Sequence, residues 1–244
     1  MNAVKSIIYL TILSNFFISA IFGQFDVEFV SHQINTSAAI NIVDADLDGD
    51  GDIDIIGHGD GEFWWYENDG NGLFTEHTIS DSSRLTSALD VADIDGDGDL
   101  DIVSGYSNNA EADVHVQLFV NDGDENFTKI EVGSSCAGDK AMRVIDLDGD
   151  GDGDIVSVAG SGPTNSCIAW YENAGDNSFT KYDVGTTMDR PTDMRALDVD
   201  GDGDVDILSS NMNHHNGMTA WYENDGSQGF TENIISNLYS HGIH

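Results

Sequence analysis

Short segments with β-strand character recur along the chain, separated by residues that favour turns. Four of them, between residues 87 and 133, read SALDVAD, DLDIVSG, VHVQLFVN and FTKIEVG, and Gly, Asn, Asp or Ser bounds each one. Alternating or β-branched residues between such boundaries predict short strands. No segment combines a sustained helical period with capping residues. The pattern therefore predicts an all-β fold.

The same sequence unit occurs four times. An acidic stretch reads DLDGDGDID from Asp46, DIDGDGDLD from Asp93, DLDGDGDGD from Asp146 and DVDGDGDVD from Asp198, at intervals of 47, 53 and 52 residues. A second motif keeps step with it: WYENDG from Trp65, LFVNDG from Leu118, WYENAG from Trp170 and WYENDG from Trp221. A Phe-Thr pair follows each copy, at Phe74, Phe127, Phe179 and Phe230.

A repeat of about 50 residues with four strands is typical of a β-propeller blade. A β-helix has a shorter repeat, and a β-sandwich does not repeat its sequence so closely. We therefore expect about four four-stranded blades. Residues 25–34 match the last strand of a unit, and the fourth unit ends with the same strand, so both ends carry an outer strand. We expect an incomplete part of a larger, seven- or eight-bladed propeller, such as a truncated product, with a compact four-bladed ring as the alternative.

The acidic stretches have the spacing of a calcium loop. Like charges this close repel by about 1 kcal/mol per pair even in water, so a bound cation is expected. With Asp46 as position 1, aspartates occupy positions 1, 3, 5, 7 and 9, and Gly51 at position 6 allows a sharp bend. Carboxylates without His or Cys disfavour transition metals, and the many oxygens suit Ca²⁺ better than Mg²⁺.

The loops are not EF-hands. An EF-hand has a bidentate Glu at position 12, where this chain has Gly57, Ser104, Ser157 or Ser209. Position 9 is always Asp, and β-branched residues follow it directly. Each loop is therefore expected to join two strands of a hairpin.

The motif DxDGDGDxDI, once per unit, resembles the FG-GAP or VCBS repeat family, which includes the calcium-binding blades of integrin α-subunit propellers. The resemblance covers residues from about 25 to 244. It implies a propeller whose calcium hairpins link the first and second strands of each blade, with about four Ca²⁺ ions. It also implies ligation by the side chains at positions 1, 3, 5 and 9 and by the carbonyl oxygen at position 7. The predicted metal residues are Asp46, Asp48, Asp50, Asp52, Asp54, Asp93, Asp95, Asp97, Asp99, Asp101, Asp146, Asp148, Asp150, Asp152, Asp154, Asp198, Asp200, Asp202, Asp204 and Asp206. Gly153 departs from the pattern, so its strand is expected to pack less well.

Charge narrows the choice of partner. The chain has 45 acidic and 8 basic side chains and a formal net charge of −37. Nucleic acids and anionic membranes require basic patches, so neither is expected as a partner. Cations, or neutral ligands such as sugars, fit better. The hydrophobic content of 39% argues against a disordered chain.

The N-terminus has the features of a secretory signal peptide. Lys5 precedes an apolar run over residues 7–22, which is short for a membrane span and is interrupted by Ser14 and Asn15. We expect a signal peptide at 1–23 and the propeller at 24–244, with no membrane span after cleavage. An uncleaved anchor is the alternative. The mature chain is expected to be secreted, extracellular or periplasmic, or on the cell surface. There Cys136 and Cys167 either form a disulfide or remain buried thiols.

A glycan or protein ligand is expected on the face opposite the acidic loops, where longer loops of divergent sequence lie. This face would carry His58, Tyr106, His214 and His215, with Arg84, Lys140 and Arg190 close by. His214 and His215 are expected to be solvated. The repeated Trp-Tyr pairs are expected to pack between blades, although they could also stack on sugars.

The chain contains no GxSxG, no HExxH and no phosphate-binding glycine loop, so no enzymatic activity is expected. The sequence predicts a secreted calcium-binding module for binding or adhesion. The alternative is a fragment of a secreted polysaccharide lyase or hydrolase, in which Tyr106, His58 and Arg84 would be recruited for catalysis.

Overall fold

The computed structural model describes residues 19–20, 23–24, 41–59, 62–80, 88–107, 114–135, 139–160, 166–185, 188–211 and 216–239. The chain divides into two units, Met1–Ser37 and Ala38–His244. In the first unit, β1 (Ser19–Ala20) pairs antiparallel with β2 (Gly23–Gln24). Most of the predicted signal peptide, and the strand predicted over 25–34, lie outside the described residues.

The second unit contains four antiparallel four-stranded sheets, here called blades 1 to 4. Neighbouring strands follow one another in the chain, so each blade is a simple meander. Blade 1 holds β3 (Asn41–Ala45), β4 (Asp54–Gly59), β5 (Glu62–Asn68) and β6 (Phe74–Ser80). Blade 2 holds β7 (Leu89–Ala92), β8 (Asp101–Ser107), β9 (Val114–Asn121) and β10 (Phe127–Ser135). Blade 3 holds β11 (Asp139–Ile145), β12 (Asp154–Gly160), β13 (Ser166–Asn173) and β14 (Phe179–Gly185). Blade 4 holds β15 (Pro191–Leu197), β16 (Asp206–Asn211), β17 (Asn216–Asn224) and β18 (Phe230–Tyr239).

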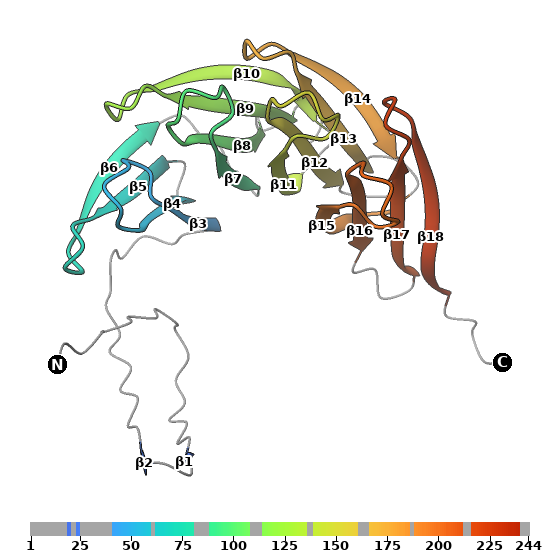
Figure 1. The fold of residues 1–244 in the computed structure, drawn as a ribbon, viewed down its shortest axis with the longest axis horizontal. Helices are drawn as coiled ribbons and strands as arrows, with labels where there is room; N and C mark the ends of the chain where they lie inside the picture. The colour runs from blue at the N-terminus through green and yellow to red at the C-terminus, as the bar shows by residue number, and fades with distance from the viewer. Residues whose placement is uncertain are drawn as a thin grey trace. The chain divides into compact units, whose positions relative to one another are not determined.

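These sheets stand side by side along an open arc (Figure 1). The first strands of the blades, β3, β7, β11 and β15, lie on the concave side, and the fourth strands lie on the convex side. The all-β propeller architecture predicted from the repeat is confirmed. The sheets do not close on themselves, so the compact four-bladed ring is not the arrangement observed. In the part of the chain that the structure describes, no helix is long and apolar enough to cross a membrane.

The hydrophobic core lies between blades rather than within them. Successive strand residues point to opposite faces of a sheet, so the two members of each aromatic pair contact different neighbours. Trp170 packs with residues of blade 4, and Tyr171 packs with residues of blade 2. Both are buried, as is Trp65 between blades 1 and 2. These tryptophans therefore serve interblade packing, as predicted, and their large apolar surfaces contribute strongly to the stability of the interfaces.

Blade 2 keeps this arrangement with different residues. Leu118 and Phe119 replace Trp and Tyr and face blades 3 and 1 respectively. In blade 3, Val144 and Ile94 approach the position where a side chain on Gly153 would lie, at 3.1 and 3.4 Å. A side chain at this position would therefore meet its neighbours closely, and the poorer packing expected there stays a prediction.

Candidate metal centre

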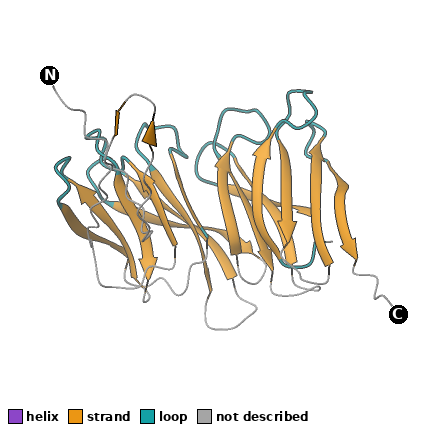
Figure 2. Cartoon of the chain, turned by 90° about the horizontal axis from the view of Figure 1, so that it is seen from below, coloured by secondary structure: helices purple, strands orange, loops and turns teal. Residues whose placement is uncertain are grey.

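Each acidic loop connects the first and second strands of a blade, as predicted. The loops join β3 to β4, β7 to β8, β11 to β12 and β15 to β16. Most of the described loops lie along one edge of the strands (Figure 2). The glycine at position 6 has a positive φ, +97° at Gly51, which is a conformation that glycine adopts without strain. This turn brings the aspartates before and after it onto one side of the loop.

Backbone hydrogen bonds fix the orientation of the carboxylates. Asp93 at position 1 accepts hydrogen bonds from Gly96 N at 2.8 Å and Gly98 N at 3.1 Å. Asp95 at position 3 accepts one from the amide of Asp97, and Asp97 accepts one from Asp99. Loops 3 and 4 repeat all four of these bonds. The loop is thus preorganised by its own main chain.

Three carboxylates converge in every loop. One oxygen from each lies within 4.8 Å of the other two. In the second, third and fourth loops these residues occupy positions 1, 3 and 9, whereas in the first loop they occupy positions 1, 3 and 5. The groups are Asp46, Asp48 and Asp50; Asp93, Asp95 and Asp101; Asp146, Asp148 and Asp154; and Asp198, Asp200 and Asp206. Each group could hold a metal ion.

The donor set fits a hard cation. All the converging atoms are carboxylate oxygens, which calcium and magnesium prefer. In the first loop, Oδ1 of Asp46 is buried and has no hydrogen-bond partner among the described residues. A buried, unpaired carboxylate oxygen is costly, and coordination of a cation would satisfy it.

The electrostatics of the loops also favour a cation. Burial raises the pKa of Asp101 and of Asp154 to about 6, with further contributions from neighbouring aspartates. The same cause raises the pKa of Asp48 and of Asp54 in the first loop. A bound divalent ion would reverse this preference for the protonated form.

The position-9 aspartate also anchors the loop to the rest of its blade. Asp101 is fully buried, and its two oxygens accept hydrogen bonds from Ile94 N at 3.0 Å and Asn121 N at 2.8 Å. Asp54, Asp154 and Asp206 make the same pair of bonds. Each therefore ties position 2 of its loop to the end of the third strand.

The position-7 aspartate points away from the converging carboxylates. A Cβ atom built on Gly123, in the turn after β9, would lie 2.4 Å from Oδ2 of Asp99. Gly70, Gly175 and Gly226 are equally close to Asp52, Asp152 and Asp204. The side chain at position 7 therefore packs against the neighbouring turn. This orientation agrees with the prediction that position 7 offers its main-chain carbonyl, which stays a prediction.

Sequence reasoning missed the asparagine that ends the third strand. The Nδ2 group of Asn173 donates to Gly153 O in its own blade and to Ile94 O in the acidic loop of blade 2, at 3.3 and 3.2 Å. Asn121 and Asn224 bridge to the preceding blade in the same way. In the described residues, the Nδ2 group of Asn68 in blade 1 donates only within its own blade, to Ile53 O. The signal was present, because Asn and Gly are the only residues common to all four copies of the WYENDG motif.

The residues predicted on the opposite face are only partly described. His58 is 3% exposed and stacks on Phe63, so the prediction that it is available on a binding surface was wrong. Burial lowers its pKa to about 4. Lys140 and Arg190 are exposed. Arg84, His214, His215 and the side chain of Tyr106 lie outside the described residues. Cys167 is buried and disulfide-bonded, and Cys136, the other cysteine of the sequence, lies outside the described residues.

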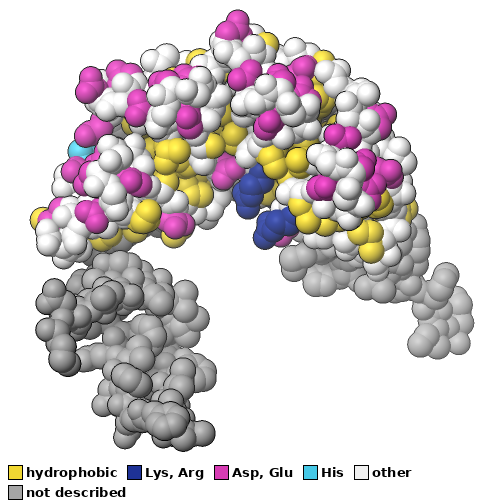
Figure 3. Space-filling model, viewed as in Figure 1, with side chains coloured by type: hydrophobic (Ala, Val, Ile, Leu, Met, Phe, Trp, Pro, Cys, Tyr) yellow, Lys and Arg dark blue, Asp and Glu magenta, His cyan; other side chains and the backbone are white. Residues whose placement is uncertain are grey.

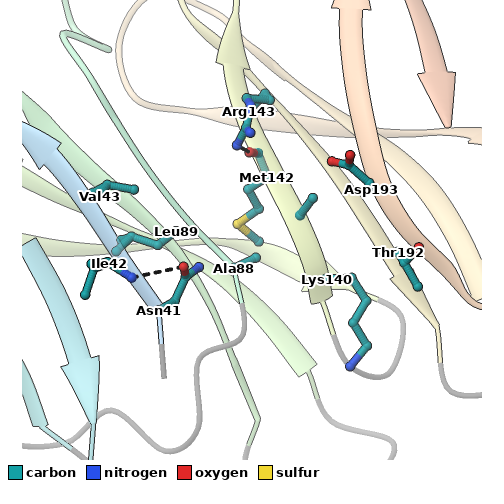
Figure 4. A pocket seen from close by; sticks show the side chains of 11 residues that line it. Asn41, Ile42, Val43, Ala88, Leu89, Lys140, Met142, Arg143, Thr192 and Asp193 are labelled. Atoms are coloured by element: carbon teal, nitrogen blue, oxygen red, sulfur yellow. Dashed lines mark hydrogen bonds between the residues drawn. The ribbon is translucent and has the colours of Figure 1, made fainter. Parts of the chain in front are cut away.

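A hollow of about 230 Å³ opens on the concave wall of the arc (Figure 4). It is lined by residues of β3, β11 and β15 and by the start of β7, including Asn41, Lys140, Arg143 and Thr192. Figure 3 shows acidic side chains over much of the visible surface and basic side chains at the concave wall. The hollow therefore combines apolar groups and two basic side chains with one carboxylate, Asp193, in a strongly acidic molecule.

The fold and loop geometry agree with a family match. The model of the FG-GAP-like repeat matches three overlapping segments, 46–104, 93–157 and 146–209. Together they cover more than half of the chain, and the chain belongs to this family. No curated protein sequence matches it.

Two solved structures show the extent of the likeness. One concerns specific recognition of non-reducing terminal N-acetylglucosamine by a lectin of Agrocybe aegerita, with 22% identity, a TM-score of 0.53, and coverage of 80% of this chain and 51% of the lectin chain. This chain thus spans about half the length of the lectin, and the likeness concerns the fold. The other is the Tc holotoxin pore of Photorhabdus luminescens, with 18% identity, a TM-score of 0.30, and coverage of 83% of this chain and 12% of the toxin chain.

Proposed function

We propose that this protein is a secreted calcium-binding β-propeller that acts as a binding or adhesion module for a glycan or protein ligand. The observation that carries the proposal is the convergence of three carboxylates in each of four acidic loops. The family and the propeller fold support a binding module in general. The role of calcium and the nature of the ligand are the specific parts of the proposal.

Each loop would hold one Ca²⁺ ion, whose two positive charges would offset part of the negative charge of the clustered carboxylates. In the second loop, Asp93, Asp95 and Asp101 would supply side-chain oxygens. An ion that binds only the folded state stabilises it by about 2.7 kcal/mol when its concentration is a hundredfold above Kd. We therefore assign calcium a structural role: it would hold each loop rigid against the turn that follows the third strand.

A neutral sugar suits the acidic surface better than an anionic polymer does. The solved lectin of similar fold recognises N-acetylglucosamine, which supports a carbohydrate ligand as the first choice to test. Two places could accept it: the loops opposite the acidic loops, and the hollow between the inner strands, which offers Asn41, Thr192 and Lys140 for hydrogen bonds. A protein ligand remains the alternative within the same proposal.

The first experiment is calorimetric titration of calcium into the chelator-treated full chain, with circular dichroism and thermal unfolding followed in parallel. We expect about four ions, weaker binding of magnesium, and a rise in melting temperature. Absence of saturable binding by folded protein would overturn the calcium assignment. A glycan array in calcium then tests the ligand, with a chelated sample as the control for dependence on folding.

Two further parts of the proposal have separate tests. N-terminal sequencing of the exported protein should show cleavage near residue 23, and retention in the membrane would contradict secretion. Incubation with polysaccharides of varied charge should give binding without turnover. Release of reducing ends or of unsaturated products would instead favour the lyase or hydrolase alternative.

A further inference from the structure

The outward face of blade 1 is built like an interface. Ile42 on β3 is 57% exposed, whereas the residues at the same repeat position, Leu89, Met142 and Met194, are at most 3% exposed. Each of these three packs against the preceding blade. Val43, the next residue of β3, packs into the cluster between blades 1 and 2, so Ile42 belongs to the opposite face of the strand. Ile53 at position 8 of the first loop is 52% exposed, whereas Leu100 and Val205 at that position pack into interblade clusters.

The outward face of blade 4 has the complementary character. Val199 at position 2 of the fourth loop is 39% exposed, whereas Leu47, Ile94 and Leu147 at this position are at most 4% exposed, because the following blade covers them. Ile235 is 60% exposed, whereas its equivalent Val184 is 9% exposed and belongs to the cluster between blades 3 and 4. Leu197, at 44%, lies on the same face.

Polar groups at the two ends match as well. At each internal interface, the asparagine that ends the third strand donates to the position-2 carbonyl oxygen of the preceding blade. On blade 1, the side-chain amide of Asn68 donates to one acceptor among the described residues, whereas the equivalent asparagines of the other blades each donate to two. Blade 4 presents the carbonyl of Val199, the equivalent of Leu147 O, which accepts from Asn224 at 3.1 Å.

We call the surface formed by Ile42, Ile53 and Asn68 the leading face, and the surface formed by Leu197, Val199 and Ile235 the trailing face. We propose that the leading face of one copy of this chain docks on the trailing face of a second copy, and that two chains joined head to tail close a ring of eight blades. The contact repeats the internal interfaces, with Ile53 of one copy on Val199 of the other. It goes beyond the proposed binding function and does not rest on it.

A head-to-tail contact is heterologous, so it closes into a ring only when the rotation per chain fits, and otherwise forms filaments. The side chains that define the two faces are open to solvent in the single chain: Ile42 and Ile53 are more than half exposed, and Val199 and Ile235 are 39% and 60% exposed. The net charge of −37 per chain opposes association, so cations and moderate salt should favour the dimer.

The test is sedimentation equilibrium of the full chain in calcium over a wide range of concentrations. We expect a reversible dimer. Ile42→Asp and Ile235→Asp should each raise the dissociation constant of the dimer by about a hundredfold or more, because each would bury a carboxylate in the contact. The matched control is Ile234→Asp. This neighbour of Ile235 is 55% exposed, and its equivalent Asp183 stays exposed inside the arc, so the change should leave the dimer intact.

A mixture of the two defective variants gives the sharpest readout. Each variant keeps one good face, so mixing them should restore one of the two contacts and yield a dimer that neither forms alone. Circular dichroism and calcium binding of each variant verify that it is folded. Three results would each overturn the proposal. The wild type could stay monomeric at every concentration, Ile234→Asp could weaken the dimer as much as the other two variants do, or the mixture could form no dimer. Species that grow steadily with concentration overturn the closed ring.

Discussion

Asn224 donates its side-chain amide to the main-chain carbonyl of Leu147 at 3.1 Å, although 77 residues separate them in the sequence. The same amide also donates to Val205 O within its own blade. Asn224 is 4% exposed; its bond to Leu147 O is buried, and its bond to Val205 O is partly buried. One side chain therefore links an acidic loop to the loop of the preceding blade, and stability and cation binding should be coupled along the arc.

Removal of one of these links should destabilise the arc. Asn173→Ala would remove a buried hydrogen bond to Ile94 O and a partly buried one to Gly153 O, which should cost about 1 to 3 kcal/mol of unfolding free energy. Asn68→Ala is the matched control, because in the described residues Asn68 donates only within its own blade. Thermal unfolding of dilute samples should show the larger loss for Asn173→Ala. Equal losses would contradict the interblade role.

The position-3 and position-7 aspartates should behave differently in calcium binding. Asp95→Asn replaces one of the converging carboxylates with a neutral amide. It should abolish or strongly weaken one of the about four calcium sites. Asp99→Asn removes the same charge, but the side chain of Asp99 packs against Gly123, so the site should persist. Calorimetric stoichiometry distinguishes the two variants. Loss of the site in both would show that charge alone, rather than geometry, holds the ion.

A side chain at the glycine of the turn after the third strand should cost more stability than backbone strain alone. Gly123 has φ +75°, and a Cβ there would lie 2.4 Å from the Asp99 carboxylate, so Gly123→Ala combines backbone strain with a steric clash. Gly96→Ala has nearly the same φ, +74°, with nothing within 4 Å of the added Cβ. Backbone strain should lower the unfolding free energy of both variants by about 1 kcal/mol, and the clash should lower that of Gly123→Ala further. Chemical denaturation measures the difference, and equal losses would rule out the clash.

Acidification should destabilise the protein through His58. Burial lowers the folded-state pKa of His58 from 6.5 to about 4. Its contribution to stability is therefore fully present above pH 6.5 and is lost as the pH falls toward 4, by about 2 kcal/mol between pH 7.5 and 5. His58→Leu should remove this part of the pH dependence and should not destabilise at pH 7, because Nε2 has no hydrogen-bond partner among the described residues.

The comparison of wild type with His58→Leu isolates this contribution. The buried aspartates act in the opposite direction when no metal is bound: the pKa of Asp101 is raised to about 6, so its protonation favours the folded state as the pH falls. That contribution is common to both proteins and cancels in the difference. The unfolding free energy of both proteins is measured at several pH values. A difference between them that does not change with pH would contradict the assignment to His58.

The sequence by itself determined the features that depend on local chain geometry. Alternation in segments such as VHVQLFVN, with turn residues between them, is sufficient to define strands, and the repeat of about 50 residues defines the blade. The spacing of aspartates and glycines around Asp93 likewise determined a hairpin loop with inward carboxylates, because its hydrogen bonds span only two to five residues.

Only the tertiary structure decided what depends on the docking of one sheet against the next. The partner of Asn173 in the preceding blade lies 79 residues away, and no local pattern specifies which carbonyl it reaches. The burial of His58, the outward turn of Asp99, and the exposure of Ile42 where Met142 is covered follow from the neighbours of each blade. Identical repeats differ at the ends of the arc because burial is a property of the assembled sheets, not of the unit that repeats.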